Sequence, residues 1–162
     1  MANPAQRSDK HGREPTIENR RARHDYFVEE TLECGLKLTG TEVKSVRSGE
    51  VSLQEGYVEA SESPPGLTLL GAHIAEYPQA DERRQHRPDR PRVLLAHRRE
   101  IVKMAIAARA KGMTIVPLKL YFVRGRAKLL IGLAKGKKQY DKRADIRKRE
   151  AEREMGRGRG RG

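Results

Sequence analysis

Cysteine is almost absent from this sequence, which contains a single one, Cys34, in 162 residues. One thiol cannot form a disulfide within the chain, so the fold has to be held by packing alone. This usage suits a reducing compartment, and we therefore expect a cytoplasmic protein. Because His73, His86 and His97 do not stand at metal-ligand spacing from this cysteine, we expect no metal and no cofactor.

Long hydrophobic runs are also missing. No stretch approaches the roughly 18 consecutive apolar residues that a membrane-spanning helix needs. The basic residues Arg7, Lys10 and Arg13 are not followed by the apolar segment of a secretory signal, so we expect no membrane partner. Only 36% of the residues are hydrophobic and 35% are charged, so a core can form over only part of the chain.

Acidic residues are too few to balance the basic ones. The chain has 35 Lys and Arg against 22 Asp and Glu, which gives a net charge of +13. The basic residues lie in clusters, and clustered positive charge favours a polyanionic partner such as a nucleic acid.

Catalytic patterns are missing as well. His24 and Asp25 are adjacent in the sequence, a spacing that implies no catalytic geometry, and no serine stands in a nucleophile-elbow motif. Segment 132–137 has too few residues between its glycines for a phosphate-binding loop. The sequence therefore predicts a binding protein and not an enzyme.

Alternation of apolar and polar residues predicts several β-strands. The last two form a hairpin, in which Val116, Leu118, Leu120 and Phe122 are expected to share one face. Phe27 and Phe122 are both expected in the core. The expected strands cover residues 32–38, 51–59, 67–74, 116–122 and 127–133.

Two short helices are expected between these strands, over residues 42–47 and 101–108. Segment 78–92 contains five arginines and three prolines and is expected to be a mobile basic loop. The whole pattern predicts a mainly β fold with minor α content. A closed antiparallel β-barrel of the oligonucleotide-binding (OB) type, with short flanking helices, fits it best, although periodicity alone does not fix the topology.

The chain is expected to divide into three parts. Residues 1–18 are polar and read as a flexible leader, and residues 19–134 form the OB-like domain. Residues 135–162 form a basic tail, in which Ile146 and Met155 are nearly the only large apolar groups. Such a segment cannot bury enough surface to fold alone, so it is predicted to be disordered when free and helical on RNA.

Three segments in register carry a resemblance to a known family. They are Asn19–Phe27, Gly40–Gly49 and Gly132–Arg143. All three resemble signatures of the small protein B (SmpB) family, whose members bind transfer-messenger RNA (tmRNA), and the match runs in order from about residue 19 to residue 155.

The resemblance implies a function in ribosome rescue. Members of the family bind the tRNA-like domain of alanyl-tmRNA and bring it to the A site of a stalled 70S ribosome, with elongation factor Tu as an indirect partner through the alanyl-tmRNA. The protein stands in for the anticodon arm that this RNA lacks. Its tail enters the vacant mRNA channel near the small-subunit decoding centre, and the nascent peptide is then tagged.

The resemblance also assigns site residues. A carboxylate at Glu33 can accept hydrogen bonds from base N–H groups, and Lys128 alternates outward and can reach a phosphate. The expected tmRNA-binding residues are Asn19, Arg21, Arg23, Glu33, Leu95 and Lys128. The tail residues expected to contact the ribosome are Lys135, Lys137, Lys138, Tyr140, Asp141, Lys142 and Arg143. Position 140 is His in some members, so no role that needs an imidazole charge is expected of Tyr140.

Two other classes of protein stay open at this point. A general ribosomal or assembly protein of the same fold would bind ribosomal RNA without preferring the tRNA-like domain. A nuclease would need carboxylates or histidines converging in a pocket, and the sequence gives no pattern for one.

Overall fold

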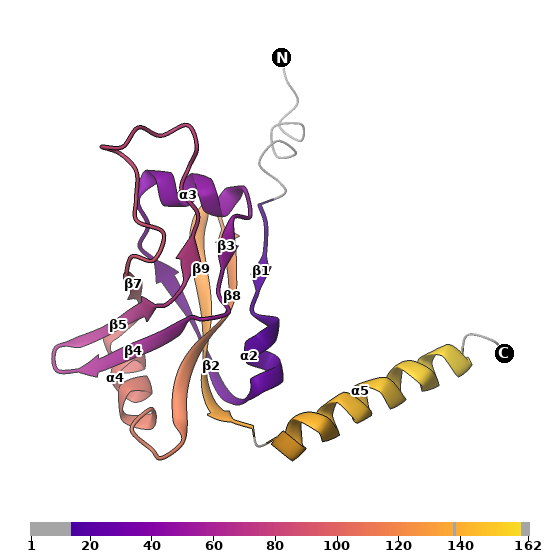
Figure 1. The fold of residues 1–162 in the computed structure, drawn as a ribbon. Helices are drawn as coiled ribbons and strands as arrows, with labels where there is room; N and C mark the ends of the chain where they lie inside the picture. Colours follow the sequence, from indigo (N-terminus) through magenta and orange to yellow (C-terminus); the bar gives the residue numbers. More distant parts are fainter. Residues whose placement is uncertain (1–13, 138, 160–162) are drawn as a thin grey trace.

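The computed structural model describes residues 14–137 and 139–159, drawn as a ribbon in Figure 1. This part of the chain consists mainly of strands and contains four helices. In chain order the elements are β1 (Ile17–Glu18), α2 (Arg20–Asp25), β2 (Tyr26–Leu36), α3 (Gly40–Arg47), β3 (Val51–Ser52), β4 (Tyr57–Glu62), β5 (Pro65–Leu70), β6 (His73–Ile74), β7 (Arg92–Leu95), α4 (Arg98–Ala107), β8 (Met113–Val123), β9 (Arg126–Gly136) and α5 (Gln139–Arg159).

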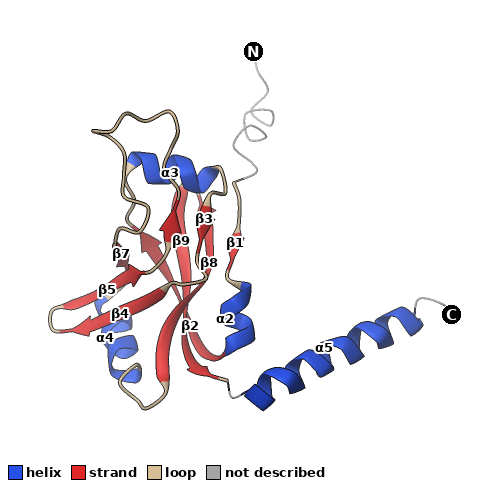
Figure 2. Cartoon of the chain, viewed as in Figure 1, coloured by secondary structure: helices blue, strands red, loops and turns tan. Residues whose placement is uncertain are grey.

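The described strands form a seven-stranded sheet in the order β1-β8-β9-β2-β7-β5-β4, and β3 pairs separately with β6 (Figure 2). All of the pairs are antiparallel. The hairpin of β8 and β9 is the longest pairing, and its turn places Arg124 and Gly125 at φ values of 51° and 76°. Two successive positive φ values give a turn whose twist matches that of the strands, so the predicted hairpin is confirmed.

The expected closed barrel is wrong, whereas the mainly β composition with a few helices is confirmed. No ladder joins the terminal strands β4 and β1 in the described residues, so the sheet is open. The free edge of β8 is already occupied: β1 pairs at Leu120 and Lys119, and the backbone N–H of Asn19 donates to the Leu118 carbonyl at 2.8 Å. Pro117 comes next and has no N–H to offer another strand.

The main core lies on the concave side of the sheet, beneath helix α4. Cys34 is fully buried there, and burial raises the pKa of its thiol to about 12. Helix α4 packs against β4 and β5, while α3 lies at the end of the molecule away from α4 (Figure 1). The core side chains include Leu36, Val46, Leu67, Leu69, Ile74, Leu94, Met104, Ile115, Leu120, Leu129 and Ile131.

A β-bulge in β8 changes the face of the sheet that its side chains reach. The register shifts between Pro117 and Lys119, so one extra residue stands opposite β9. Because side chains alternate with period two, that residue reverses the alternation. Val116 and Leu118 therefore pack in a separate cluster beneath α2, whereas Leu120 enters the main core. The expectation that these residues share one face with Phe122 is wrong.

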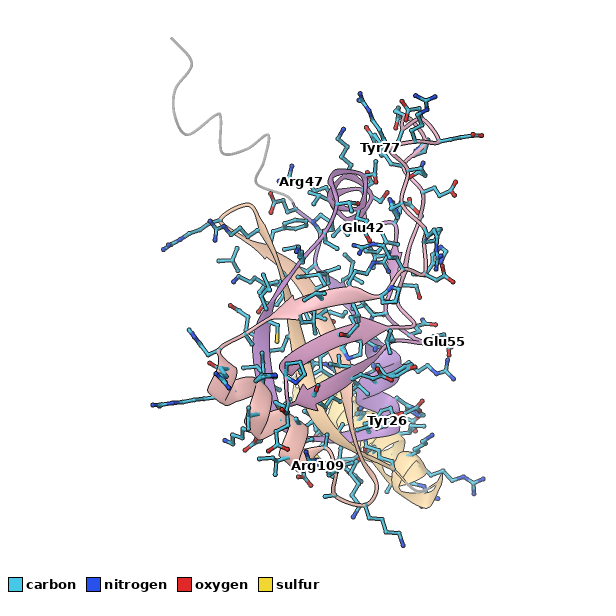
Figure 3. The ribbon with its side chains drawn as sticks, turned by 90° about the vertical axis from the view of Figure 1, so that its left-hand side faces the viewer. Tyr26, Glu42, Arg47, Glu55, Tyr77 and Arg109 are labelled. Atoms are coloured by element: carbon cyan, nitrogen blue, oxygen red, sulfur yellow. The ribbon has the colours of Figure 1, made fainter. Side chains whose placement is uncertain are left out.

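A buried ion pair fixes the segment before β7. The carboxylate of Glu42 has no exposed surface, and it accepts hydrogen bonds from Arg92 Nε at 2.6 Å and from the guanidinium of Arg90. Arg92 is also fully buried and donates to the carbonyl oxygens of Ala72 at 3.0 Å and Pro88 at 2.9 Å. The expected mobile basic loop is thus anchored at its C-terminal end, because two of its arginines point inward. Figure 3 shows Glu42 at the end of the molecule that carries Arg47 and Tyr77.

The environment of Glu42 favours its ionised form. Burial acts to raise the pKa of this carboxyl, but hydrogen bonds from Arg90, from the Thr39 backbone N–H and from Arg92 outweigh it and lower the pKa to about 2. The folded-state pKa lies below the ordinary value of 4.5. The stabilisation is therefore present above pH 4.5 and is lost as the pH falls toward 2.

Removal of the Glu42 charge should destabilise the fold. We expect Glu42→Gln to lower the free energy of unfolding by about 3–5 kcal/mol, because two arginines lose their buried counter-charge. Urea unfolding at pH 7 measures this change. Glu59→Gln is the matched control on an exposed strand position and should change stability by less than about 0.5 kcal/mol. Equal stability of both variants would contradict this role of Glu42.

Candidate nucleic-acid interface

The convex face of the sheet brings three of the predicted RNA-binding residues together. The strand register places Leu95 of β7 opposite Gly35 of β2, and Gly35 opposite Lys128 of β9. Glu33 lies two residues before Gly35 and therefore on the same face. Leu95 is 56% exposed although it is a large apolar residue, and Glu33 is exposed as well. Strand β7 was not among the strands expected from the sequence, so the face on which Leu95 lies could not be predicted.

Gly35 has no side chain that would project from the centre of this face. A Cβ atom at this position would lie 3.3 Å from the Cβ of Leu95, so a side chain would crowd its neighbour. The absence of that side chain contributes to a recess of about 320 Å³, with apolar walls and two cations. The residues lining it are Gly35, Leu36, Leu38, Val43, Leu95, Phe122, Gly125, Arg126, Ala127 and Lys128.

Two residues from β8 extend the same face. Tyr121 lies opposite Lys128, and its phenol donates a hydrogen bond to Glu33 Oε2. The Nζ atom of Lys119 lies 5.4 Å from the centre of the Tyr121 ring. Burial and the carboxylate of Glu33 raise the pKa of Tyr121 to about 12, so the phenol keeps its proton. The outward alternation of Lys119 and Tyr121 was visible in the sequence, but their meeting with Glu33 depends on strand pairing.

Asn19 has a structural role that the sequence did not predict. Its side chain is only 2% exposed and caps α2 by accepting from the backbone N–H of Ala22 at 3.1 Å. Its Nδ2 group donates to the carbonyls of Pro117 at 2.8 Å and Leu53 at 3.1 Å. Both donors of the amide are thus satisfied inside the protein, and the RNA contact expected of Asn19 stays a prediction.

The neighbouring arginines of α2 stay at the surface. Arg23 is exposed and carries no ion pair among the described residues. Arg21 is half exposed, but its guanidinium pairs with Glu55 and, at 3.5 Å, with Asp25. Arg23 can therefore meet a phosphate directly, whereas Arg21 has to exchange internal partners to do so.

The start of the basic tail is fastened to α2. Lys142 Nζ lies 3.1 Å from Asp25 Oδ1, and Lys137 Nζ pairs with Asp145. The backbone N–H of Lys137 also donates to the Asp25 carbonyl at 2.8 Å. These contacts join residues on the two sides of the junction between β9 and α5. They define the tail junction as Asp25, Lys137, Lys142 and Asp145.

Phe27 and Asp25 complete the surroundings of the tail junction. Phe27 is 45% exposed and lies 4.8 Å, measured from its ring centre, from Lys137 Nζ, so its predicted place in the core is wrong. The hydrogen bond with His24 holds the pKa of Asp25 below its usual value, with Lys142 adding to the effect and partial burial opposing it. Asp25 thus forms ion pairs with Arg21 of its own helix and with Lys142 of α5.

The remaining residues that were predicted to belong to the tail site lie on both sides of this junction. Lys135 is exposed near the end of β9, opposite Phe27, and Arg143 is exposed on α5. Tyr140 and Asp141 belong to the first turn of α5, but their side chains lie outside the described residues, as does the whole of Lys138. The helix extends away from the sheet beyond its first turns (Figure 1).

Neither a membrane span nor a metal cluster is found in residues 14–137 and 139–159. No helix there is both long and apolar enough to cross a bilayer. No three or more His, Cys, Asp or Glu side chains come together as possible ligands in the same part of the chain.

Comparison with known proteins identifies the family. The sequence profile described as "SmpB protein" matches residues 16–160. The chain belongs to the SmpB family. The resemblance predicted from the three motifs is confirmed.

Individual members of the family are similar to this sequence over most of its length. An SsrA-binding protein of Roseiflexus sp. (strain RS-1) is 52% identical over 140 residues, covering 86% of this chain and 87% of the relative. The SsrA-binding protein of Thermobifida fusca (strain YX) is 49% identical over 157 residues, covering 97% of this chain and 96% of the relative.

A solved structure described as "tmRNA-SmpB: a journey to the center of the bacterial ribosome" is similar in fold. The match has a TM-score of 0.65 at 44% sequence identity, and it covers 77% of this chain and 86% of that one. The likeness therefore includes both the arrangement of the elements and the residues that build them.

Loss of the Asp25 charge should loosen the start of α5. We expect Asp25→Asn to speed amide hydrogen exchange over residues 142–150 by about two- to fivefold, the scale of a partly exposed ion pair. Hydrogen-exchange mass spectrometry measures the effect. Asp81→Asn, in the loop before β7, serves as the matched control and should leave that segment unchanged. Identical exchange in the two variants would show that Lys142 does not hold the helix.

Proposed function

We propose that this chain is an RNA-binding adaptor of trans-translation. It binds the tRNA-like domain of alanyl-tmRNA and delivers it to the A site of a stalled 70S ribosome, where it stands in for the missing anticodon arm. The single observation that carries the proposal is the likeness to SsrA-binding proteins at about 50% identity over most of the chain. The likeness to a tmRNA-SmpB structure of the bacterial ribosome supports the same partners.

Different parts of the molecule contact the tRNA-like domain and the ribosome. Glu33, Leu95 and Lys128 lie on one exposed face, which suits the tRNA-like domain because a carboxylate, an apolar group and a cation can meet base edges, bases and phosphates. The tail with Lys137, Lys142 and its neighbours meets the mRNA channel near the decoding centre. Elongation factor Tu takes part only through alanyl-tmRNA, and the site of action is the cytoplasm.

The finer features of the fold belong to the same proposal. The curved sheet with helices at its ends is of the OB type, although it stays open, and it acts by binding without catalysis or a cofactor. Helix α5 is fully populated only on RNA, because its described side chains are mostly exposed and few are apolar. The contacts at the tail junction hold only its first turns.

A general ribosomal or assembly protein is the main alternative function. It would bind ribosomal RNA fragments as tightly as the tRNA-like domain, so a competition assay at fixed salt separates the two. The proposed function requires the purified chain to prefer alanyl-tmRNA over bulk tRNA. A nuclease is tested by incubation of labelled RNA with the protein and magnesium, where the proposed function leaves the RNA intact.

Glu33 should contribute directly to RNA affinity. We expect Glu33→Ala to weaken the complex with the tRNA-like domain by about 1–3 kcal/mol, the scale of a lost specific contact. Binding is measured by fluorescence anisotropy across a salt titration. Glu59→Ala, which removes an exposed glutamate from β4, is the control. Unchanged affinity of Glu33→Ala at every salt concentration would remove this residue from the interface.

Removal of the tail should separate tmRNA binding from rescue. The cut belongs after Lys137 and not before Lys135 as the sequence suggested, because β9 continues to Gly136. We expect the chain ending at Lys137 to keep its affinity for the tRNA-like domain within a few-fold and to lose peptide tagging in a reconstituted translation system. Parallel loss of both activities would contradict this division of roles.

A further inference from the structure

The carboxylate of Glu33 is held by a single neighbour on the convex face. Tyr121 lies two strands away from it, 88 residues later in the sequence, and donates its phenolic hydrogen to Oε2. Among the described residues Glu33 forms no ion pair, although Lys128 stands in the same part of the sheet. The orientation of this carboxylate thus depends on a neutral donor and not on a direct ion pair among the described residues.

One side of the carboxylate stays available to a ligand. Oε2 is occupied by the phenol, whereas Oε1 has no partner among the described residues. The phenol keeps its proton because burial and the adjacent carboxylate raise the pKa of Tyr121 to about 12. A free glutamate side chain loses rotamer entropy when a ligand fixes it, and a side chain already fixed in the unbound protein avoids that loss.

We propose that Tyr121 is a positioning residue, whose phenol holds Glu33 so that Oε1 accepts an N–H from the edge of an unstacked base in the bound RNA. A carboxylate is an acceptor only, so its ligand has to present an N–H or O–H donor, and base edges carry amino and imino donors. The phosphodiester groups of RNA carry no such donor. The proposal deepens the proposed function, on which it rests.

The surrounding residues suit a base at this position. Leu95 is exposed beside Gly35, so an apolar surface lies next to the fixed carboxylate and can pack on the face of the same or a neighbouring base. Lys119 of β8 and Lys128 of β9 both stand on the side of β2 away from Leu95, where they can meet neighbouring phosphates. The pair formed by Tyr121 and Glu33 therefore contributes base recognition to a face whose lysines are not selective.

A double-mutant cycle on the full chain tests the proposal. The variants are Tyr121→Phe, Glu33→Gln and their combination, and the probe is a transcript of the tRNA-like domain of tmRNA. Tyr57→Phe removes a phenol from an exposed tyrosine on β4 and is the matched control. Dissociation constants are measured at several salt concentrations, at a temperature at which circular dichroism shows every variant folded.

We expect Tyr121→Phe to weaken binding about three- to tenfold while Tyr57→Phe has no effect. The double variant should bind as weakly as Glu33→Gln alone, because the phenol acts only through the carboxylate. The dependence of affinity on salt should stay the same, since no phosphate contact is lost.

Three results would overturn the proposal. They are unchanged binding of Tyr121→Phe, losses that multiply in the double variant, and a weaker salt dependence, which would assign the phenol to a phosphate. Each is distinct from failure of the proposed function, in which the unmodified chain itself shows no preference for the transcript over bulk tRNA.

Discussion

The buried pair of Glu42 and Arg92 is the interaction on which the arrangement of the RNA-binding face depends. Glu42 belongs to α3 and Arg92 is the first residue of β7, the short strand that carries Leu95. Four residues of strand offer little hydrogen bonding of their own, so β7 needs a fixed starting point. A guanidinium that reaches a carboxylate and two carbonyls provides it. Polar contacts at one end of the protein thus position an apolar side chain on its exposed face.

The bulge in β8 divides the convex face into two regions with different uses. On the near side of the bulge, Val116 and Leu118 are covered by α2, and Asn19 ties that helix to the sheet edge. On the far side, Lys119 and Tyr121 point outward and remain uncovered. A single inserted residue therefore determines where the sheet packs against its own chain and where it is open to a partner.

Local patterns in the sequence were sufficient for the elements that depend on near neighbours. The hairpin of β8 and β9 follows from alternation and a glycine turn, and the outward direction of Glu33 and Lys128 follows from their strands. The pairing of Glu42 with Arg92 joins residues 50 positions apart, and the burial of Asn19 depends on carbonyls of two distant segments. Neither contact leaves a periodic signal. The bulge could not be predicted from the sequence, because one extra residue changes the face of the sheet that the following side chains reach without changing the composition of the strand.

Strand β9 connects the two RNA-binding regions through a single stretch of backbone. Lys128 lies near its start and Gly136 ends it, and eight residues at about 3.4 Å each separate them by roughly 27 Å. Ladders on both sides make this segment stiff. The strand therefore keeps the face of Glu33, Leu95 and Lys128 at a set distance from the start of the tail, which is the spacing that the proposed function requires between its two RNA contacts.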